Sequence, residues 1–187
     1  MKRSEIEKAL RKELDRERFR HTMGVMYTAA SLAMAHGEDM EKALLAGLLH
    51  DCAKCIPNDK KLKLCRNYHL KITEAEKKSP YLLHAKLGAY LAKTIYGVDD
   101  PEILRAIEVH TTGAPGMSRL DKILFIADYI EPNRDKAANL SKVRDMAFQD
   151  LDDTMRRILK DTLIYLEKSR DDIDPMTTRT YEYFKQL

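Results

Sequence analysis

The stretch DRERFRHTMGVMYTAASLAMAHG, residues 15–37, decides the fold class of this chain. Its apolar side chains recur at steps of three and four residues, the spacing that one buried face of an α-helix requires. These positions are Phe19, Met23, Met26, Ala30 and Ala33. Asp15 is a residue type that caps helix N-termini, and Gly37 is typical of the position just past a helix C-terminus. The stretch therefore predicts one long amphipathic helix.

Signals of this kind continue along nearly the whole chain. Ser4 with Glu7, and Thr73 with Glu76, have the spacing of a capping box. The expected helices begin at Ser4, Asp15, Asp39, Asn58, Thr73, Ser79, Asp100, Ser118, Ser141, Asp150 and Thr177. The third of them is expected to end near Lys54. With seven glycines, six prolines and no run of alternating β-branched residues, the sequence predicts an all-α fold, a helical bundle.

The bulk composition argues against several classes of protein. A length of 187 residues fits a single domain, 1–187. The 33 basic and 30 acidic residues nearly balance, which gives no reason to expect nucleic-acid binding. The apolar runs are too short to cross a membrane, the N-terminus has no apolar signal core, and three cysteines do not suggest a disulfide framework. We therefore expect a cytoplasmic protein that binds neither nucleic acid nor membranes.

Four of the six histidines stand on an expected buried helix face or at a helix end. They are His21, His50, His84 and His110. Asp51 follows His50 directly, and Asp128 lies within the apolar run FIADYI, where an unpaired carboxylate would be costly. Imidazole and carboxylate groups suit iron, manganese, zinc and related divalent ions, and helical bundles build dinuclear sites from such side chains. The sequence therefore predicts a metal site.

Five sequence words in this order resemble the HD superfamily of metal-dependent phosphohydrolases, and more narrowly the YqeK family. They are RFRHTMGV (18–25), HDCAK (50–54), HAKLGA (84–89), HTTG (110–113) and ADYIEPNR (127–134). The tail PMTTRTY (175–181) extends the resemblance over nearly the whole chain. The YqeK family comprises bacterial HD-domain hydrolases that split diadenosine tetraphosphate symmetrically into two ADP.

The resemblance implies a role for each candidate ligand. His21, His50, Asp51 and Asp128 would hold one ion, and Asp51 would bridge to a second ion held by His84 and His110. Family members resemble iron enzymes, although the ligand chemistry also accepts manganese, cobalt or zinc. The resemblance further implies a homodimer and a dinucleoside polyphosphate or nucleotide as the ligand.

A mechanism follows from this implied dinuclear centre. Metal binding lowers the pKa of water from about 15.7 to about 7 in favourable sites, so a metal-activated water would attack phosphorus. Lys54 stands three residues past Asp51, and we expect it to neutralise the attacked phosphate or the leaving oxygen. The candidate substrate-binding residues are Arg18, Thr111, Thr112, Arg134, Thr177 and Tyr181.

Purely structural roles are also possible for several of these residues. Any one histidine could be a hydrogen-bonded core residue, Asp128 could pair with a buried arginine, and Lys54 could be a solvated cation at a helix end. Cys52, Cys55, Cys65 and His69 have the types and approximate spacing of a structural zinc site. The lysines of KKLK (60–63) are expected to form a solvated face.

Other activities also remain open at this point. Another HD phosphohydrolase acting on nucleotides or deoxynucleotides would use the same metal ligands. A non-catalytic nucleotide sensor would be expected to lack one of the ligands or Lys54, and all of them are present here.

Overall fold

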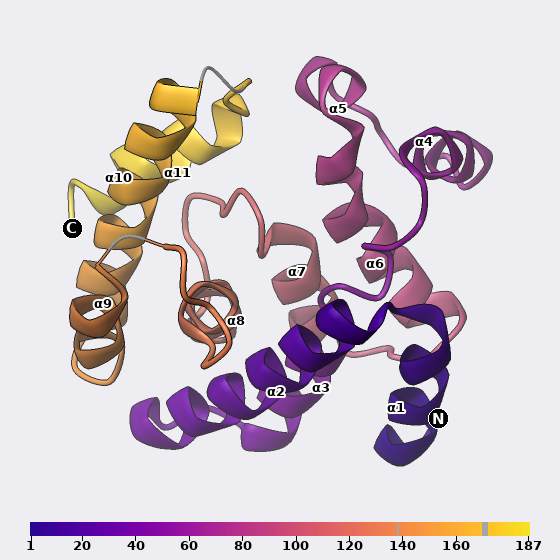
Figure 1. Ribbon diagram of the computed structural model, residues 1–187, viewed down its shortest axis with the longest axis horizontal. Helices are drawn as coiled ribbons and strands as arrows, with labels where there is room; N and C mark the ends of the chain where they lie inside the picture. Colours follow the sequence, from indigo (N-terminus) through magenta and orange to yellow (C-terminus); the bar gives the residue numbers. More distant parts are fainter. Residues whose placement is uncertain (138, 170–171) are drawn as a thin grey trace.

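The computed structural model describes residues 1–137, 139–169 and 172–187, and this part of the chain contains helices and no strand (Figure 1). The predicted all-α fold is therefore confirmed. The helices are α1 (Arg3–Glu13), α2 (Arg16–His36), α3 (Met40–Leu49), α4 (Asn58–Asn67), α5 (Glu74–Lys78), the 3-10 turn η1 (Pro80–Leu82), α6 (Leu83–Thr94), α7 (Pro101–Val109), α8 (Arg119–Ile130), α9 (Leu140–Ala147), α10 (Leu151–Ser169) and α11 (Pro175–Phe184).

Most of the predicted caps are in place. Asp15 accepts a hydrogen bond from the Arg18 backbone N–H at 2.8 Å, which begins α2, and Gly37 ends this helix in the left-handed conformation at φ 67°. Ser118 accepts from the backbone N–H of Asp121 at the start of α8, in a capping box. These local signals fix the two helices that carry much of the site.

Several predicted boundaries were wrong. The helix predicted from Ser4 begins at Arg3, and Glu5 accepts from the backbone N–H of Lys2 at 2.8 Å. The last helix begins at Pro175 after an Asp174 cap, two residues before the predicted Thr177. The largest error concerns α3, which ends at Leu49 and gives way to a run of turns that covers the predicted last turn up to Lys54.

Two further boundaries also differ from the predicted ones. Ser79 and Pro80 start a short 3-10 turn, and the α-helix proper begins only at Leu83. The helix predicted from Ser141 begins at Leu140, because Asn139 adopts the left-handed conformation at φ 59° just before it.

The helices pack around one core that lies between α2, α3, α6, α7 and α8. α2 packs on α3 and α8, α7 packs on α6 and α8, and α10 joins α8 to α9 and α11. In Figure 1 the C-terminal helices α9, α10 and α11 lie on one side of α8, and α4 to α6 lie on the other. Leu32, Leu48, Ile107 and Ile126 are among the fully buried residues of this core. The part of the chain that the structure describes has no helix long and apolar enough to cross a membrane.

Candidate metal centre

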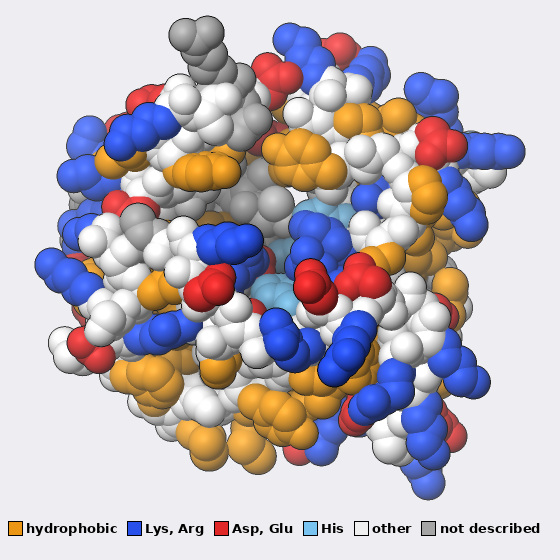
Figure 2. Space-filling view, in the orientation of Figure 1, with side chains coloured by type: hydrophobic (Ala, Val, Ile, Leu, Met, Phe, Trp, Pro, Cys, Tyr) orange, Lys and Arg blue, Asp and Glu red, His pale blue; other side chains and the backbone are white. Residues whose placement is uncertain are grey.

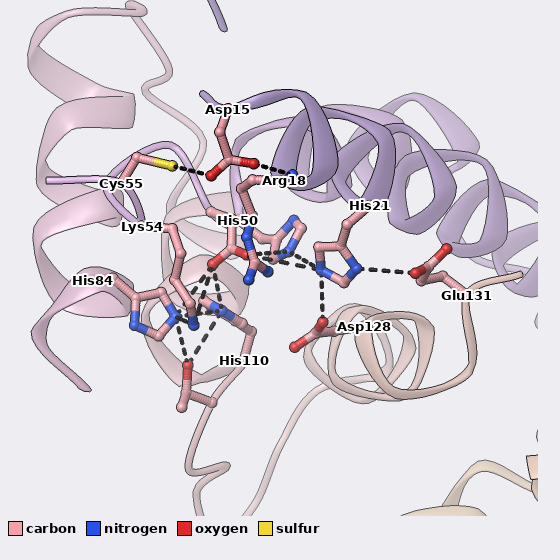
Figure 3. A network of polar contacts seen from close by, with 12 residues as sticks. Asp15, Arg18, His21, His50, Lys54, Cys55, His84, His110, Asp128 and Glu131 are labelled. Carbon is pink, nitrogen blue, oxygen red and sulfur yellow. Dashed lines mark hydrogen bonds and ion pairs between the residues drawn. The ribbon is translucent and has the colours of Figure 1, made fainter. Parts of the chain in front are cut away.

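The six predicted metal ligands converge from five elements (Figure 3). His21 lies on α2 and Asp128 on α8, while His84 lies on the first turn of α6. The pair His50–Asp51 follows the end of α3, and His110 follows the end of α7. All six are buried except Asp128, whose exposure is intermediate. The structure therefore brings together residues that are up to 107 positions apart, from 21 to 128.

One half of the cluster, the first ligand group, comprises His21, His50, Asp128 and the Oδ2 atom of Asp51. His21 Nε2 lies 3.0 Å from Asp128 Oδ1 and 3.8 Å from Asp51 Oδ2. His50 Nε2 lies 3.3 Å from His21 Nε2 and 3.4 Å from Asp51 Oδ2. The ligand atoms of His21, His50 and Asp51 lie within 4.8 Å of one another, so they could hold one cation. Asp128, beside His21, forms another such group with His50 and His110.

The other half, the second ligand group, comprises His84, His110 and the Oδ1 atom of Asp51. His84 Nε2 lies 3.2 Å from His110 Nε2 and 3.3 Å from Asp51 Oδ1, while His110 Nε2 lies 3.8 Å from the same oxygen. Asp51 therefore turns one carboxylate oxygen toward each group, an orientation that permits it to bridge two cations.

In three of the four histidines, the hydrogen bond made by Nδ1 determines whether Nε2, which faces the cluster, is a hydrogen-bond donor or an acceptor. Nδ1 of His50, His84 and His110 lies 2.7, 2.6 and 2.7 Å from the backbone carbonyls of Gly47, Tyr81 and Ile107. A carbonyl can only accept a hydrogen bond, so each Nδ1 carries the proton and donates it. In the neutral ring the Nε2 atom is then an acceptor, the form in which imidazole binds a metal.

This arrangement fits divalent cations. The acceptor nitrogens of His84 and His110 face each other at 3.2 Å, which is unfavourable unless a proton or a cation lies between them. In the first group the acceptor nitrogen of His50 lies 3.3 Å from His21 Nε2. In addition, Oδ1 of Asp51 is buried without a hydrogen-bond partner among the described residues. Buried polar atoms are normally satisfied, and a metal ion would satisfy this one.

The protonation of the buried site residues also suits a cation. Burial raises the pKa of Asp51, but its contacts with His50 and His110 and the charge of Lys54 hold this pKa well below its usual range. For Asp128, the effect of burial is likewise outweighed by its contact with His21 and by the Arg134 charge, and its pKa is also well below the usual range. Burial and the Lys54 charge lower the pKa of His84, which keeps this imidazole neutral near pH 7.

Three cations contact the ligand groups. Arg18 Nη1 lies 2.7 Å from Asp51 Oδ2, and Arg134 Nη2 lies 2.9 Å from Asp128 Oδ1. Lys54 Nζ lies 3.1 Å from His84 Nε2 and 3.8 Å from Asp51 Oδ1. In Figure 2 the pale-blue histidines lie at the bottom of a hollow with lysine and arginine side chains around it. Lys54 is thus directed at the site, and the interpretation of it as a mere solvated helix-end cation was wrong.

The remaining predicted substrate-binding residues lie at different distances from the cluster. Thr111 Oγ1 is 3.2 Å from both His84 Nε2 and His110 Nε2, and Thr177 lines a small cavity of about 130 Å³ together with His110. Thr112 lines a cleft of about 400 Å³ between α6 and α11. Tyr181 packs partly buried against the hydrophobic core. Their roles toward a substrate stay predictions.

The structure contradicts the alternative zinc site. Cys52 is buried with its Sγ 3.5 Å from the Gly88 carbonyl, whereas Cys55 is exposed beside Asp15. Over the described residues, no group of three potential ligand atoms includes a cysteine. The cysteines are therefore free thiols.

Sequence reasoning missed the structural roles of two charged residues. Glu131 is 1% exposed, and its Oε1 lies 3.1 Å from His21 Nδ1. Lys61, predicted to lie on a solvated face, is 3% exposed, and its Nζ donates to the Lys54 carbonyl at 3.2 Å. Burial and the Lys54 charge lower the pKa of Lys61. Only the three-dimensional contacts reveal that both residues support the site from behind.

Comparison with known proteins agrees with this geometry. A sequence model of the HD domain matches residues 18–133. A Bacillus subtilis protein named "Bis(5'-nucleosyl)-tetraphosphatase, symmetrical" is 37% identical over 98% of this chain and 97% of its own length. A protein of the same name from Halalkalibacterium halodurans is 40% identical, over 97% of this chain and 96% of its own.

A solved structure is similar over the full length. It is that of a Clostridium acetobutylicum protein, described as a "predicted HD superfamily hydrolase involved in NAD metabolism". It has a TM-score of 0.96 and 37% sequence identity, and the match covers 100% of this chain and 98% of that one. The family predicted from the sequence words is thereby confirmed, and the chain belongs to the HD domain family.

Proposed function

We propose that this chain is a symmetrical bis(5'-nucleosyl)-tetraphosphatase that hydrolyses diadenosine tetraphosphate to two ADP. Its relatives of that name match almost the entire chain rather than the HD domain alone. The single observation that carries the proposal is Asp51, whose two oxygens face two separate histidine groups. This is the arrangement that a dinuclear phosphohydrolase requires.

The two ligand groups would hold a divalent ion each, with Asp51 shared between them. Bound there, the ions would supply a strongly nucleophilic water near neutral pH and Lewis acidity at a phosphoryl oxygen. The chain itself would fix the inward direction of every Nε2 atom through the Nδ1 hydrogen bonds described above. Low pKa values of Asp51 and Asp128 keep both carboxylates ionised, as ligands must be.

The polyphosphate would be held by the three cations at the site. Arg18 and Arg134 can each form paired hydrogen bonds to phosphate oxygens, and Lys54 offers a point charge beside the second ligand group. A cleft of about 540 Å³ is lined by His21 of the first ligand group and by three arginines, Arg18, Arg20 and Arg134. We place part of the phosphate chain there, with Lys54 neutralising charge at the attacked phosphate.

Product analysis in isotopically labelled water tests the proposed reaction. Symmetrical attack consumes one water per substrate, breaks the bond between the second and third phosphates and gives two ADP. In H₂¹⁸O, one of every two ADP molecules should carry a single ¹⁸O atom. AMP together with ATP would contradict symmetrical cleavage, and hydrolysis of other nucleotides or deoxynucleotides in place of the tetraphosphate would favour the alternative HD activities.

A pair of matched variants separates chemistry from folding in this assay. Asp51→Asn keeps the size of a buried side chain at the centre and should abolish turnover. Asp121→Asn changes a buried carboxylate at the start of α8, where it accepts from Arg105 and Ser118, and should leave turnover intact. Binding of diadenosine tetraphosphate without any hydrolysis by wild-type protein would favour a nucleotide sensor.

The resemblance stated above supports finer assignments that belong to the same proposal. We propose iron as the resident metal, a single domain over residues 1–187, a homodimer and a cytoplasmic location. Metal analysis after anaerobic purification tests iron against manganese, cobalt and zinc. Light scattering tests the dimer, and a monomeric, fully active protein would contradict it.

A further inference from the structure

The four imidazoles of the site are not supported in the same way. His50, His84 and His110 donate Nδ1–H to backbone carbonyls three residues earlier in the chain. His21 differs, because its Nδ1 lies 3.1 Å from a carboxylate oxygen of Glu131, which directly follows α8. Figure 3 shows His21 between the two acids, with Asp128 on its inner side and Glu131 on its outer side.

Glu131 is itself held in one orientation. Its Oε2 accepts from the backbone N–H of Asn133 at 2.7 Å and from the Asn133 side-chain amide at 2.9 Å. Oε1 is thereby left to His21, and the whole residue is only 1% exposed. A metal ion on His21 Nε2 would require the proton of the neutral ring on Nδ1, so both oxygens of Glu131 would then accept hydrogen bonds, which a carboxylate does and an amide does not.

The space for this carboxylate depends on Gly24. A Cβ atom at position 24 would lie 2.2 Å from Glu131 Oε2 and 3.1 Å from Asn133 Nδ2. Gly24 lies in the interior of α2, where glycine is a poor helix former. Alanine would be the better helix former at this position, so we attribute the glycine to the close contact between the buried Glu131 carboxylate and α2.

We propose that Glu131, in the space that Gly24 leaves, is a positioning residue that makes the first ligand group the tighter of two cation sites. A carboxylate behind a ligating imidazole fixes the ring and strengthens Nε2 as a donor, typically by about 10- to 100-fold in metal affinity. The backbone carbonyls behind the second ligand group orient its rings but carry no negative charge, and the Lys54 ammonium lies 3.1 Å from His84 Nε2. The guanidinium groups of Arg18 and Arg134 also oppose a cation at the first group, but there the carboxylates of Asp128 and Glu131 balance them. The inference rests on the dinuclear site proposed above.

Manganese titration of metal-free protein tests this inference without any enzyme assay. Calorimetry with Mn²⁺ should resolve a tight and a weak class of site in the wild-type chain. Glu131→Gln leaves one oxygen for three donors and should weaken the tight class by about 10- to 100-fold. Gly24→Ala should do the same, because the new Cβ displaces the carboxylate. The weak class should keep its affinity in both variants.

Two controls separate positioning from general damage to the fold. Asp121→Asn removes a buried carboxylate of α8 that has no contact with the six ligands in the described structure, and it should leave both classes unchanged. The double variant Gly24→Ala/Glu131→Gln should bind no more weakly than Glu131→Gln alone, because both changes break one contact. Melting curves of the metal-free proteins should show all of them folded.

The outcomes distinguish this inference from the proposed function. If Glu131→Gln weakens both classes equally, or neither, the positioning role of Glu131 is overturned while the dinuclear site stands. If the wild-type chain binds no Mn²⁺, or a single ion, the dinuclear site itself is overturned. Selective loss of the tight class in both single variants supports the inference.

Discussion

The two halves of the metal centre share Asp51 but differ in charge. The first ligand group adds a second carboxylate, Asp128, and places Glu131 behind His21. The second has the Lys54 ammonium beside it, whereas the guanidinium groups beside the first, those of Arg18 and Arg134, are balanced by its two carboxylates. We infer from this difference that the first half would hold its ion more tightly, whereas the second half would hold the more exchangeable ion, on the side where Lys54 would neutralise the phosphate.

The largest expected effect comes from the residue that both halves share. Asp51→Asn should remove one ligand from each group, so that turnover falls by at least about 10³-fold, roughly 4 kcal/mol of transition-state stabilisation. Single-turnover kinetics at saturating Mn²⁺ would measure this loss. A variant that regains full turnover when more metal is added would show that Asp51 is a replaceable ligand and does not bridge.

Removing one histidine from each half should separate them. His21→Ala should abolish the tight Mn²⁺ class, whereas His84→Ala should remove only the weak class and leave one ion per chain. Mn²⁺ stoichiometry after gel filtration would distinguish the two. Equal losses in both variants would mean that the halves bind their ions only as a pair. His36→Ala, at the end of α2, changes a histidine outside both groups and provides the control.

The arginine on the first half should matter less than any ligand. Arg134 contacts Asp128, and loss of a charge-assisted hydrogen bond to substrate costs about 1.5–3 kcal/mol, or roughly 10- to 100-fold. Arg134→Ala should therefore raise KM for the tetraphosphate with a smaller change in kcat. Arg119→Ala removes an exposed arginine that donates to the Gly37 carbonyl and should leave KM unaltered. An unchanged KM in Arg134→Ala would remove this residue from the phosphate site.

The second half should also produce a modest pH dependence in the metal-free protein. The folded-state pKa of His84 lies well below its ordinary value of 6.5, because of burial and the Lys54 charge. As the pH falls below 6.5, the unfolded chain takes up a proton that the folded chain refuses, so stability decreases by at most about 1.4 kcal/mol per pH unit. Urea unfolding at several pH values would measure it, and His84→Asn should flatten the curve. An equal slope in that variant would argue against His84 as the source.

Local sequence signals were sufficient for the fold class and most caps. Asp15, Gly37 and Ser118 act through neighbours one to four residues away, so their effect can be predicted without tertiary structure. The end of α3 could not be predicted in this way. No glycine or proline follows Leu49 before Pro57, and the turns there contain buried residues, Asp51 among them, whose burial depends on the tertiary fold.

The site was predictable where ligand type and order are distinctive. The predicted histidines and aspartates do lie together. This could be predicted because a carboxylate within an apolar run is costly to bury unless it is paired or binds a metal. Glu131 could not be assigned a partner, since it lies 110 positions from His21 and resembles an ordinary residue after a helix. The burial of Lys61 was likewise hidden in a run of charged residues.

The most direct test of the central claim is the location of the bound ions. We would collect anomalous diffraction from crystals of the chain loaded with Mn²⁺. We expect two peaks, one on either side of Asp51, each at a coordination distance of about 2.0–2.4 Å from one of its oxygens. A single peak, or peaks that Asp51 does not contact, would contradict a dinuclear centre built on this residue.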